Sequence, residues 1–170
     1  MAQAIPARRI SYAATTFVAA TAFPNGRTLH NLLALSVCTK DHKLLSVKNR
    51  ATVERNLRLS SDELAAWIIV IDEISMMGAQ QLAQVDDRLR EVGKSESPFS
   101  RFGIILTGDF FRLSCMGMKP LYVAALETPS SIGSSQRRID PVMGAYLFRL
   151  FRLCEFKQQM RAAAWMPRPA

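Results

Sequence analysis

The stretch Trp67-Ile-Ile-Val-Ile71-Asp72-Glu73 decides the fold of this chain. An apolar, mostly β-branched run ends abruptly at two adjacent carboxylates. Such an unbroken run is typical of a strand that is buried on both faces of a parallel sheet. Open α/β sheets bind ligands at the carboxyl ends of their strands, so Asp72 and Glu73 stand where a nucleoside triphosphatase holds Mg²⁺ and orients the attacking water. Taken alone, the segment leaves one alternative open, a strand whose Asp72 caps the next helix.

A second apolar run, Phe102-Gly-Ile-Ile-Leu-Thr107, has the same character and ends at Gly108-Asp109. Between the two runs, residues 76–92 carry apolar side chains at helical spacing and polar side chains elsewhere, which predicts an amphipathic helix. Strand, helix and strand in this order predict the α/β class with a parallel sheet. We therefore expect Trp67–Ile71 and Ile104–Thr107 to be neighbouring parallel strands, joined by a right-handed crossover through the helix.

The remaining segments predict shorter elements around this core. Residues 11–23 indicate a short strand and a turn, and residues 28–37 carry a helical stripe of apolar side chains. Residues 40–60 are polar and predict a loop with a short helix. Residues 93–101 form a Gly/Ser/Pro loop, and residues 142–160 are expected to be helical in part.

Composition narrows the class of protein. The chain has 170 residues, of which 49% are apolar, so it can bury the core of one globular domain. No apolar run reaches the roughly 18 residues that a membrane span needs. The net charge of +8 favours an anionic partner, nucleic acid first. Cys38, Cys115 and Cys154 are far apart in sequence, which favours free thiols in a reducing compartment over disulfides or a zinc site.

Three motifs follow one another along the chain. They are Asp72-Glu73-Ile74-Ser75-Met76, then Leu106-Thr107-Gly108-Asp109-Phe110-Phe111-Arg112-Leu113, then Gln158-Gln159-Met160-Arg161. In order and spacing they resemble the Pif-one (petite integration frequency) family of ATP-dependent DNA helicases, superfamily one. The resemblance covers roughly residues 16–163.

This resemblance implies a fold and an activity. The fold would be a partial N-terminal RecA-type P-loop NTPase domain over residues 1–163, a mainly parallel sheet flanked by helices, with a tail over residues 164–170. The family activity is ATP hydrolysis coupled to 5′ to 3′ DNA unwinding in repair, recombination and telomere maintenance. The implied cofactors are ATP and Mg²⁺, and the implied partner is single-stranded or forked DNA rather than a membrane. The implied location is the nucleus, with the mitochondrion as the alternative.

The resemblance also implies roles for the acidic residues. Asp72 matches the Walker B acid that holds Mg²⁺, and Glu73 matches the neighbouring acid that orients the attacking water. Gly108 and Asp109 match the start of motif III, which lies against the nucleotide. Because Asp72, Glu73 and Asp109 all follow strands, we expect them to converge at the carboxyl edge of the sheet, near enough to share one ion or phosphate.

Basic and polar residues complete the implied site. Arg161 resembles the motif IV arginine that reaches the γ-phosphate, a role that suits a planar, permanently charged group. Arg112 belongs to the nucleotide-binding motif III, although the family has Gln at this position. Thr28 and His30 fall in a segment that resembles motif Ia, together with Phe17-Val-Ala-Ala20, and would contact single-stranded DNA. Taken singly, Arg161 equally suits a solvated helix residue and His30 a packing histidine.

The main departure from the family is the phosphate-binding loop. Nothing ahead of Phe17 supplies Gly-x-x-x-x-Gly-Lys-Ser/Thr. Gly93-Lys94-Ser95 is a poor candidate, because Arg88 stands where the first Gly is required and a predicted helix precedes it. We therefore expect these 170 residues alone to show no ATP hydrolysis above background.

The residues after the motifs also supply no second RecA-type domain, so we expect a truncated member that lacks both this domain and the Walker A loop. In this family the missing first strand should neighbour Ile104–Thr107, so an apolar sheet edge is expected there. Two alternatives to a helicase fragment remain open. One is a non-catalytic nucleic-acid-binding remnant, favoured by the basic residues between Arg137 and Arg168, and the other is a decayed transposon product.

Overall fold

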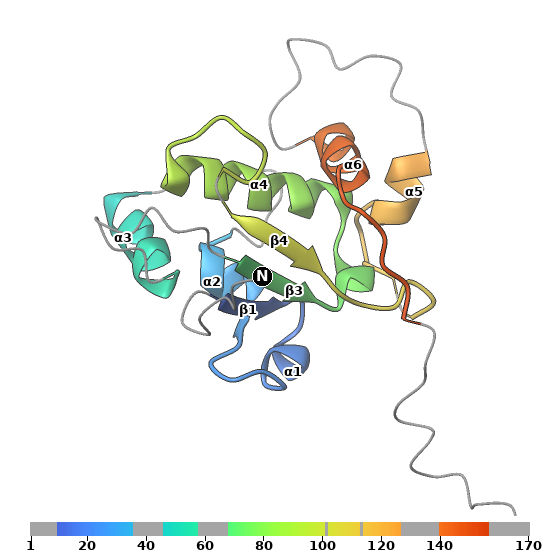
Figure 1. Ribbon diagram of the computed structural model, residues 1–170, viewed down its shortest axis with the longest axis horizontal. Coiled ribbons are helices and arrows are strands. Elements are labelled where there is room, and N and C mark those ends of the chain that lie inside the picture. Colours follow the sequence, from blue (N-terminus) through green and yellow to red (C-terminus); the bar gives the residue numbers. More distant parts are fainter. Residues whose placement is uncertain are drawn as a thin grey trace, which may run out of the picture.

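The computed structural model describes residues 10–35, 46–57, 68–100, 102–112, 114–126 and 140–156. Within these ranges a small parallel sheet is accompanied by helices (Figure 1). The elements in chain order are β1 (Ile10–Ala14), α1 (Phe17–Ala20), β2 (Arg27–Thr28), α2 (Leu29–Leu33), α3 (Val47–Asn56), β3 (Ile68–Asp72), the 3-10 turn η2 (Ile74–Met76), α4 (Ala79–Gly93), β4 (Gly103–Leu106), α5 (Leu121–Leu126) and α6 (Pro141–Arg149).

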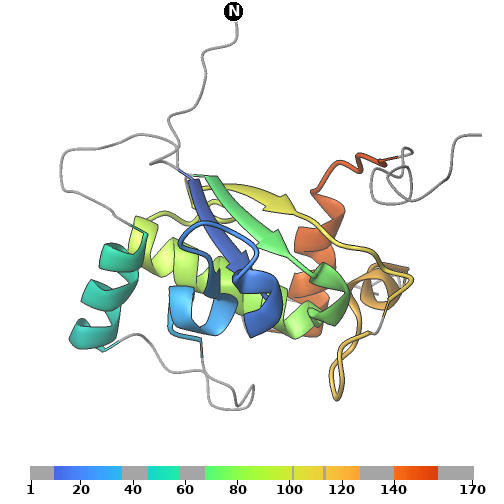
Figure 2. The ribbon, with the colours of Figure 1, turned by 90° about the horizontal axis from the view of Figure 1, so that it is seen from below.

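The sheet confirms the α/β class. Its four strands are ordered β2-β1-β3-β4, and every neighbouring pair is parallel. β3 and β4 are neighbours, with Ile69 opposite Ile104 and Ile71 opposite Leu106, as the two apolar runs predicted. In Figure 2 the strands β1, β3 and β4 run side by side, and α2 and α4 lie below them.

Burial of the strands is less complete than an all-apolar run suggests. Ile69 and Ile71 of β3 are fully buried, whereas the alternate residues Ile68 and Val70 are half-buried. β4 has one strand neighbour among the described strands, and its Ile105 is 47% exposed. The expected apolar edge is therefore present at β4.

Helix α4 is the long amphipathic helix that the sequence predicted, but it begins later. Residues 74–76 form η2, and Gly78 is the N-cap of α4, so the helix starts at Ala79 rather than at Met76. Its buried face carries apolar side chains at helical spacing, namely Leu82, Val85, Leu89 and Val92. Lys94 ends the helix in the left-handed conformation, so Gly93-Lys94-Ser95 is a helix terminus and not a phosphate loop.

Several other elements differ from expectation in length. α2 ends at Leu33, because Ala34 is left-handed and its N–H donates to the carbonyl of His30. α6 ends at Arg149, and Leu150 closes its last turn with backbone bonds, so the described residues after Leu150 do not continue the helix. α1 lies inside the segment expected to be a strand and turn, and α5 was not predicted. Trp67 lies outside the described residues.

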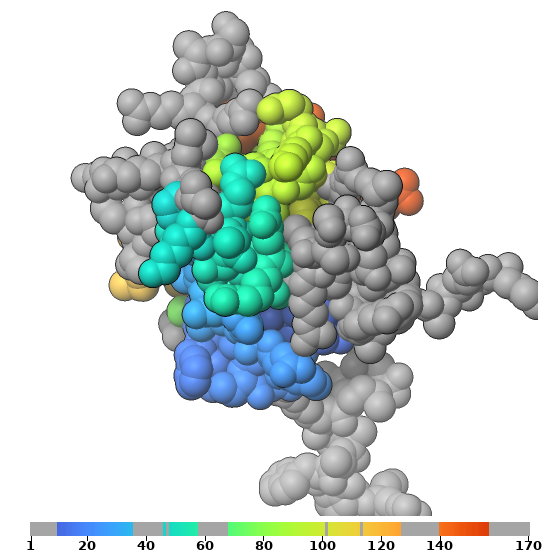
Figure 3. Space-filling view, turned by 90° about the vertical axis from the view of Figure 1, so that its left-hand side faces the viewer, coloured from blue at the N-terminus to red at the C-terminus, as the bar shows by residue number. Residues whose placement is uncertain are grey.

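Helix α3 joins α2 to the far end of α4. The Arg50 guanidinium pairs with the carboxylate of Glu91 at 3.1 Å, and the Asn56 amide donates to the carbonyl of Asn31 at 3.0 Å. Figure 3 shows α3 between the surfaces of α2 and α4. These contacts hold α3 against both α2 and α4.

Candidate functional site

The strands bring their carboxyl ends to one edge of the sheet. Ala14 at the end of β1 is in register with Thr28 of β2 on one side and with Asp72 of β3 on the other. Leu106 ends β4 opposite Ile71, so Thr107 emerges beside Asp72. Ligand sites of parallel sheets lie at this edge.

Asp72 is anchored by its neighbour strand. The Thr107 hydroxyl donates to Asp72 Oδ1 at 2.6 Å, in a partly buried position. The alternative in which Asp72 caps the next helix is wrong, because Gly78 is the N-cap of α4 and no side chain caps η2. Asp72 is therefore a strand-end carboxylate whose orientation is set by a hydrogen bond across the sheet.

Glu73 sits at a strained turn. Its φ of 57° lies in the left-handed region, which is uncommon for a residue with a side chain. Two contacts hold this turn: the Thr15 hydroxyl donates to the Glu73 carbonyl at 2.9 Å, and the N–H of Ile74 donates to the Thr107 carbonyl at 3.1 Å. The turn directs the Glu73 side chain away from the β3 pairing, with 26% of it exposed.

Gly108 passes directly against this turn. Its φ is +147°, and a Cβ at this position would lie 2.8 Å from the backbone nitrogen of Ile74. A side chain there would meet backbone that cannot give way, so the position requires glycine. The close approach lets the loop after β4 run beside Glu73.

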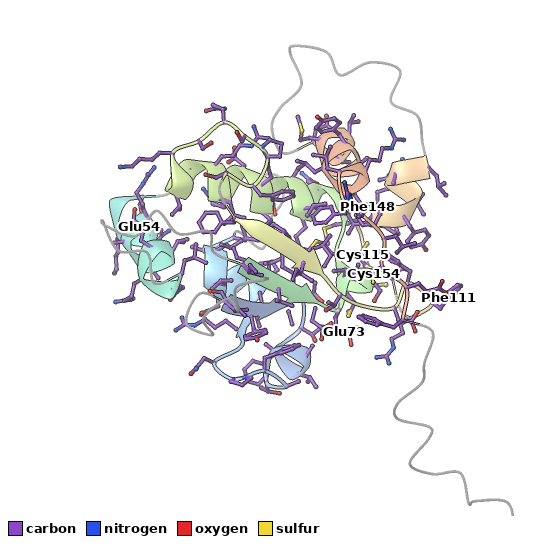
Figure 4. The ribbon with its side chains drawn as sticks, viewed as in Figure 1. Glu54, Glu73, Phe111, Cys115, Phe148 and Cys154 are labelled. Atoms are coloured by element: carbon purple, nitrogen blue, oxygen red, sulfur yellow. The ribbon has the colours of Figure 1, made fainter. Side chains whose placement is uncertain are left out.

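Arg112 brings the two motifs together. Its guanidinium lies 3.4 Å from Glu73 Oε1 and 3.8 Å from Asp109 Oδ2. Asp109 Oδ1 also accepts from the N–H of Phe111 at 2.9 Å, which shapes the start of the loop. Figure 4 shows Glu73 at the end of the sheet and Phe111 further out on the adjoining loop.

The three carboxylates thus lie at the same edge, but they are not grouped closely enough to hold one metal ion together. In the part of the chain that the structure describes, no three His, Cys, Asp or Glu side chains are grouped closely enough to hold a metal ion. Asp72 faces Thr107, whereas Glu73 and Asp109 both face Arg112. Mg²⁺ is commonly held by one or two carboxylates together with phosphate oxygens and water, and Asp72 offers such an oxygen ligand.

The other predicted residues lie apart from this cluster. Thr28 is at the same edge, where its hydroxyl accepts from the N–H of Asn31 at 3.3 Å and caps α2. His30 is half-buried in α2, and burial lowers the pKa of its imidazole below the ordinary value of 6.5. Arg161 lies outside the described residues.

Sequence reasoning missed Thr107 and Thr15 as site residues. Both follow the last apolar residue of a strand, and both hydroxyls bond to the Asp72-Glu73 segment. The signal was available for Thr107, because pairing the two apolar runs in register places it next to Asp72. For Thr15 the sequence offered no such pairing partner.

Among the described residues, no helix is long and apolar enough to cross a membrane.

Known proteins resemble this chain along most of its length. A family model described as PIF1-like helicase matches residues 1–161. The ATP-dependent DNA helicase Pif1 of Psychrobacter sp. (strain PRwf-1) is 30% identical over 158 residues, which cover 91% of this chain and 21% of that protein. The ATP-dependent DNA helicase RRM3 of Saccharomyces cerevisiae is 32% identical over 114 residues, covering 65% of this chain and 14% of that protein.

The chain is also similar to a solved structure. Pif1 helicase from Bacteroides, in complex with ADP-AlF3 and single-stranded DNA, is 29% identical with a TM-score of 0.47, covering 65% of this chain and 24% of that chain. The chain spans about a fifth or less of the two curated relatives described above. The family match over residues 1–161 nevertheless confirms the resemblance seen in the motifs: this chain belongs to the PIF1-like helicase family.

Proposed function

We propose that these residues form the part of an ATP-dependent DNA helicase that positions Mg²⁺ and the attacking water. The observation that carries this proposal is the placement of Asp72 and Glu73 at the carboxyl edge of the sheet, with Asp72 oriented by Thr107. Phosphoryl transfer depends on such positioning and on charge neutralisation. The activity would be ATP hydrolysis coupled to 5′ to 3′ unwinding of DNA.

Each residue has a distinct role in this proposal. Asp72 would hold Mg²⁺ through a carboxylate oxygen or an intervening water, and Glu73 would orient the attacking water. Gly108 and Asp109 would line the nucleotide from the loop after β4, with Arg112 beside them. Bound Mg²⁺ would supply positive charge to the phosphate oxygens. Arg161 would add its charge at the γ-phosphate.

DNA contact would fall on the end of β2 and the start of α2. Thr28 and His30 are the proposed contacts with single-stranded DNA, and the net charge of +8 supports an anionic partner. DNA as the partner implies a nuclear location, with the mitochondrion as the alternative.

A domain exchange tests the function. The 158-residue segment of the Psychrobacter helicase that aligns with this chain is replaced by the corresponding residues of this chain. We expect ATP hydrolysis that single-stranded DNA stimulates. Glu73→Gln should lower this turnover by about 100-fold or more, because the amide cannot accept a proton from water.

The matched control is Glu54→Gln on α3, far from Glu73 in Figure 4. This change should leave turnover within about twofold, because it lies outside the site. Circular dichroism confirms that each exchange protein is folded. A folded exchange protein without turnover contradicts the proposed function, and turnover that survives Glu73→Gln contradicts the role of Glu73.

A further inference from the structure

Arg112, in the loop after β4, forms ion pairs with the carboxylates of Glu73 and Asp109. It bridges Glu73 at 3.4 Å and Asp109 at 3.8 Å, and 58% of its side chain is exposed. In the structure the Glu73 carboxylate is engaged by the Arg112 guanidinium. The ion pair therefore restrains Glu73, the residue proposed to activate water.

The ion pair between Arg112 and Glu73 is weak enough for another anion to displace it. Exposed ion pairs contribute little stability, and both distances are long for charge-assisted bonds, which are typically near 2.8 Å. Guanidinium carries five donors in a planar fork that matches phosphate oxygens in pairs. A phosphate group that reaches Arg112 can therefore offer better geometry than either carboxylate does.

The local charge decides which form of phosphate fits. Asp72, Glu73 and Asp109 carry three negative charges against the one positive charge of Arg112. A bare polyphosphate would be repelled by this excess, whereas a polyphosphate that carries Mg²⁺ brings its own neutralising charge. The chemical class that the cluster accepts is therefore a magnesium-polyphosphate.

We propose that Arg112 is a charge switch: it pairs with Glu73 while the site is free of phosphate, and it exchanges Glu73 for the oxygens of a magnesium-polyphosphate. Glu73 is then released towards water only when a phosphate is in place. This inference rests on the proposed function, since it describes the regulation of the same site. It goes beyond that function because it names Arg112 as the residue that keeps Glu73 from water before a phosphate binds.

A double-mutant cycle on the 170-residue chain tests the switch. Isothermal titration with inorganic tripolyphosphate and Mg²⁺ is carried out on the natural chain, Glu73→Gln, Arg112→Gln and the double variant, with Glu54→Gln as the control. Glu73→Gln should tighten binding about fivefold, because Arg112 no longer has to leave a carboxylate. Arg112→Gln should weaken binding about tenfold, because the charged donor is lost.

The decisive comparison is the effect of Glu73→Gln in the two backgrounds. We expect most of its fivefold gain to vanish when Arg112 is already Gln, because no ion pair is left to break. An equal gain in both backgrounds would show plain charge repulsion and overturn the switch, and so would the absence of binding in every variant. Because binding is measured without turnover, a failed exchange protein would sink the proposed function and leave this result standing.

Discussion

Glu73 adopts a left-handed backbone conformation at its proposed catalytic position. A left-handed residue with a side chain costs about 1–3 kcal/mol, which the surrounding contacts must offset. Thr15 and Thr107 provide those contacts from the two flanking strands, and Gly108 provides the space. Backbone strain held in this way is common where a side chain must be aimed accurately.

We expect the free energy of unfolding to depend on pH through the burial of His30. Burial lowers the pKa of His30 in the folded chain, so the unfolded chain binds the proton more readily. The contribution of His30 to the free energy of unfolding is therefore fully present above pH 6.5. It is lost as the pH falls through 6.5 towards the lower pKa of the folded chain. Urea unfolding at pH 7.5 and pH 5.5 should show lower stability at the acidic pH.

The matched variant is His30→Gln, which removes the titrating group and keeps a polar side chain. Its stability should change less between the two pH values than that of the natural chain. An identical pH dependence in both proteins would assign the effect to other groups.

At the scale of elements, the packing of α6 on α4 depends on one glycine. Asp140 caps α6 by accepting from the N–H of Val142 at 3.0 Å, and Pro141 starts the helix. Gly144 then faces the start of α4, where a Cβ would lie 1.7 Å from the carbonyl oxygen of Ala79. The two helices can approach this closely only because position 144 has no side chain.

Gly144→Ala should therefore destabilise the fold, although alanine is the better helix former. We expect a loss of about 2 kcal/mol or more, the usual cost of overpacking a close contact. Chemical denaturation measures it, with Tyr146→Ala on the exposed side of α6 as the control, where the change should stay near about 0.5 kcal/mol. Equal stability of Gly144→Ala and the natural chain would contradict this helix contact.

At the scale of the whole molecule, the sheet has an apolar edge at β4. The described strands pair with β4 on one side, and Ile105 is 47% exposed there. Backbone N–H and C=O groups along such an edge can pair with another strand. β4 leads directly into the loop that carries Asp109 and Arg112, so this edge lies next to the site.

The 170-residue chain should self-associate through this edge as its concentration rises. Ile105→Lys should shift sedimentation velocity profiles towards the monomer, because a charge on an edge strand opposes pairing. The control is Phe111→Lys, which places the same charge on a fully exposed apolar residue of a loop rather than a strand. If both variants dissociate the chain equally, general hydrophobic contact and not edge pairing is responsible.

The sequence alone determined the class of the fold and the location of the acids. Two apolar runs, each ended by polar residues, and one amphipathic helix between them require a parallel α/β unit, because strand burial and helix periodicity are local properties. The carboxyl edge then follows from parallel pairing, and with it the proximity of Asp72, Glu73 and Asp109. The order of the motifs was enough to identify the family.

Only the tertiary structure decided how these residues face one another. The bond from Thr107 to Asp72 depends on strand register, and the pair of Arg112 with Glu73 depends on the loop conformation that Gly108 permits. The ends of α2 and α4 likewise depend on left-handed residues that no periodicity reveals, Ala34 and Lys94. Such features arise from contacts between segments distant in sequence, so the pattern within any one segment cannot encode them.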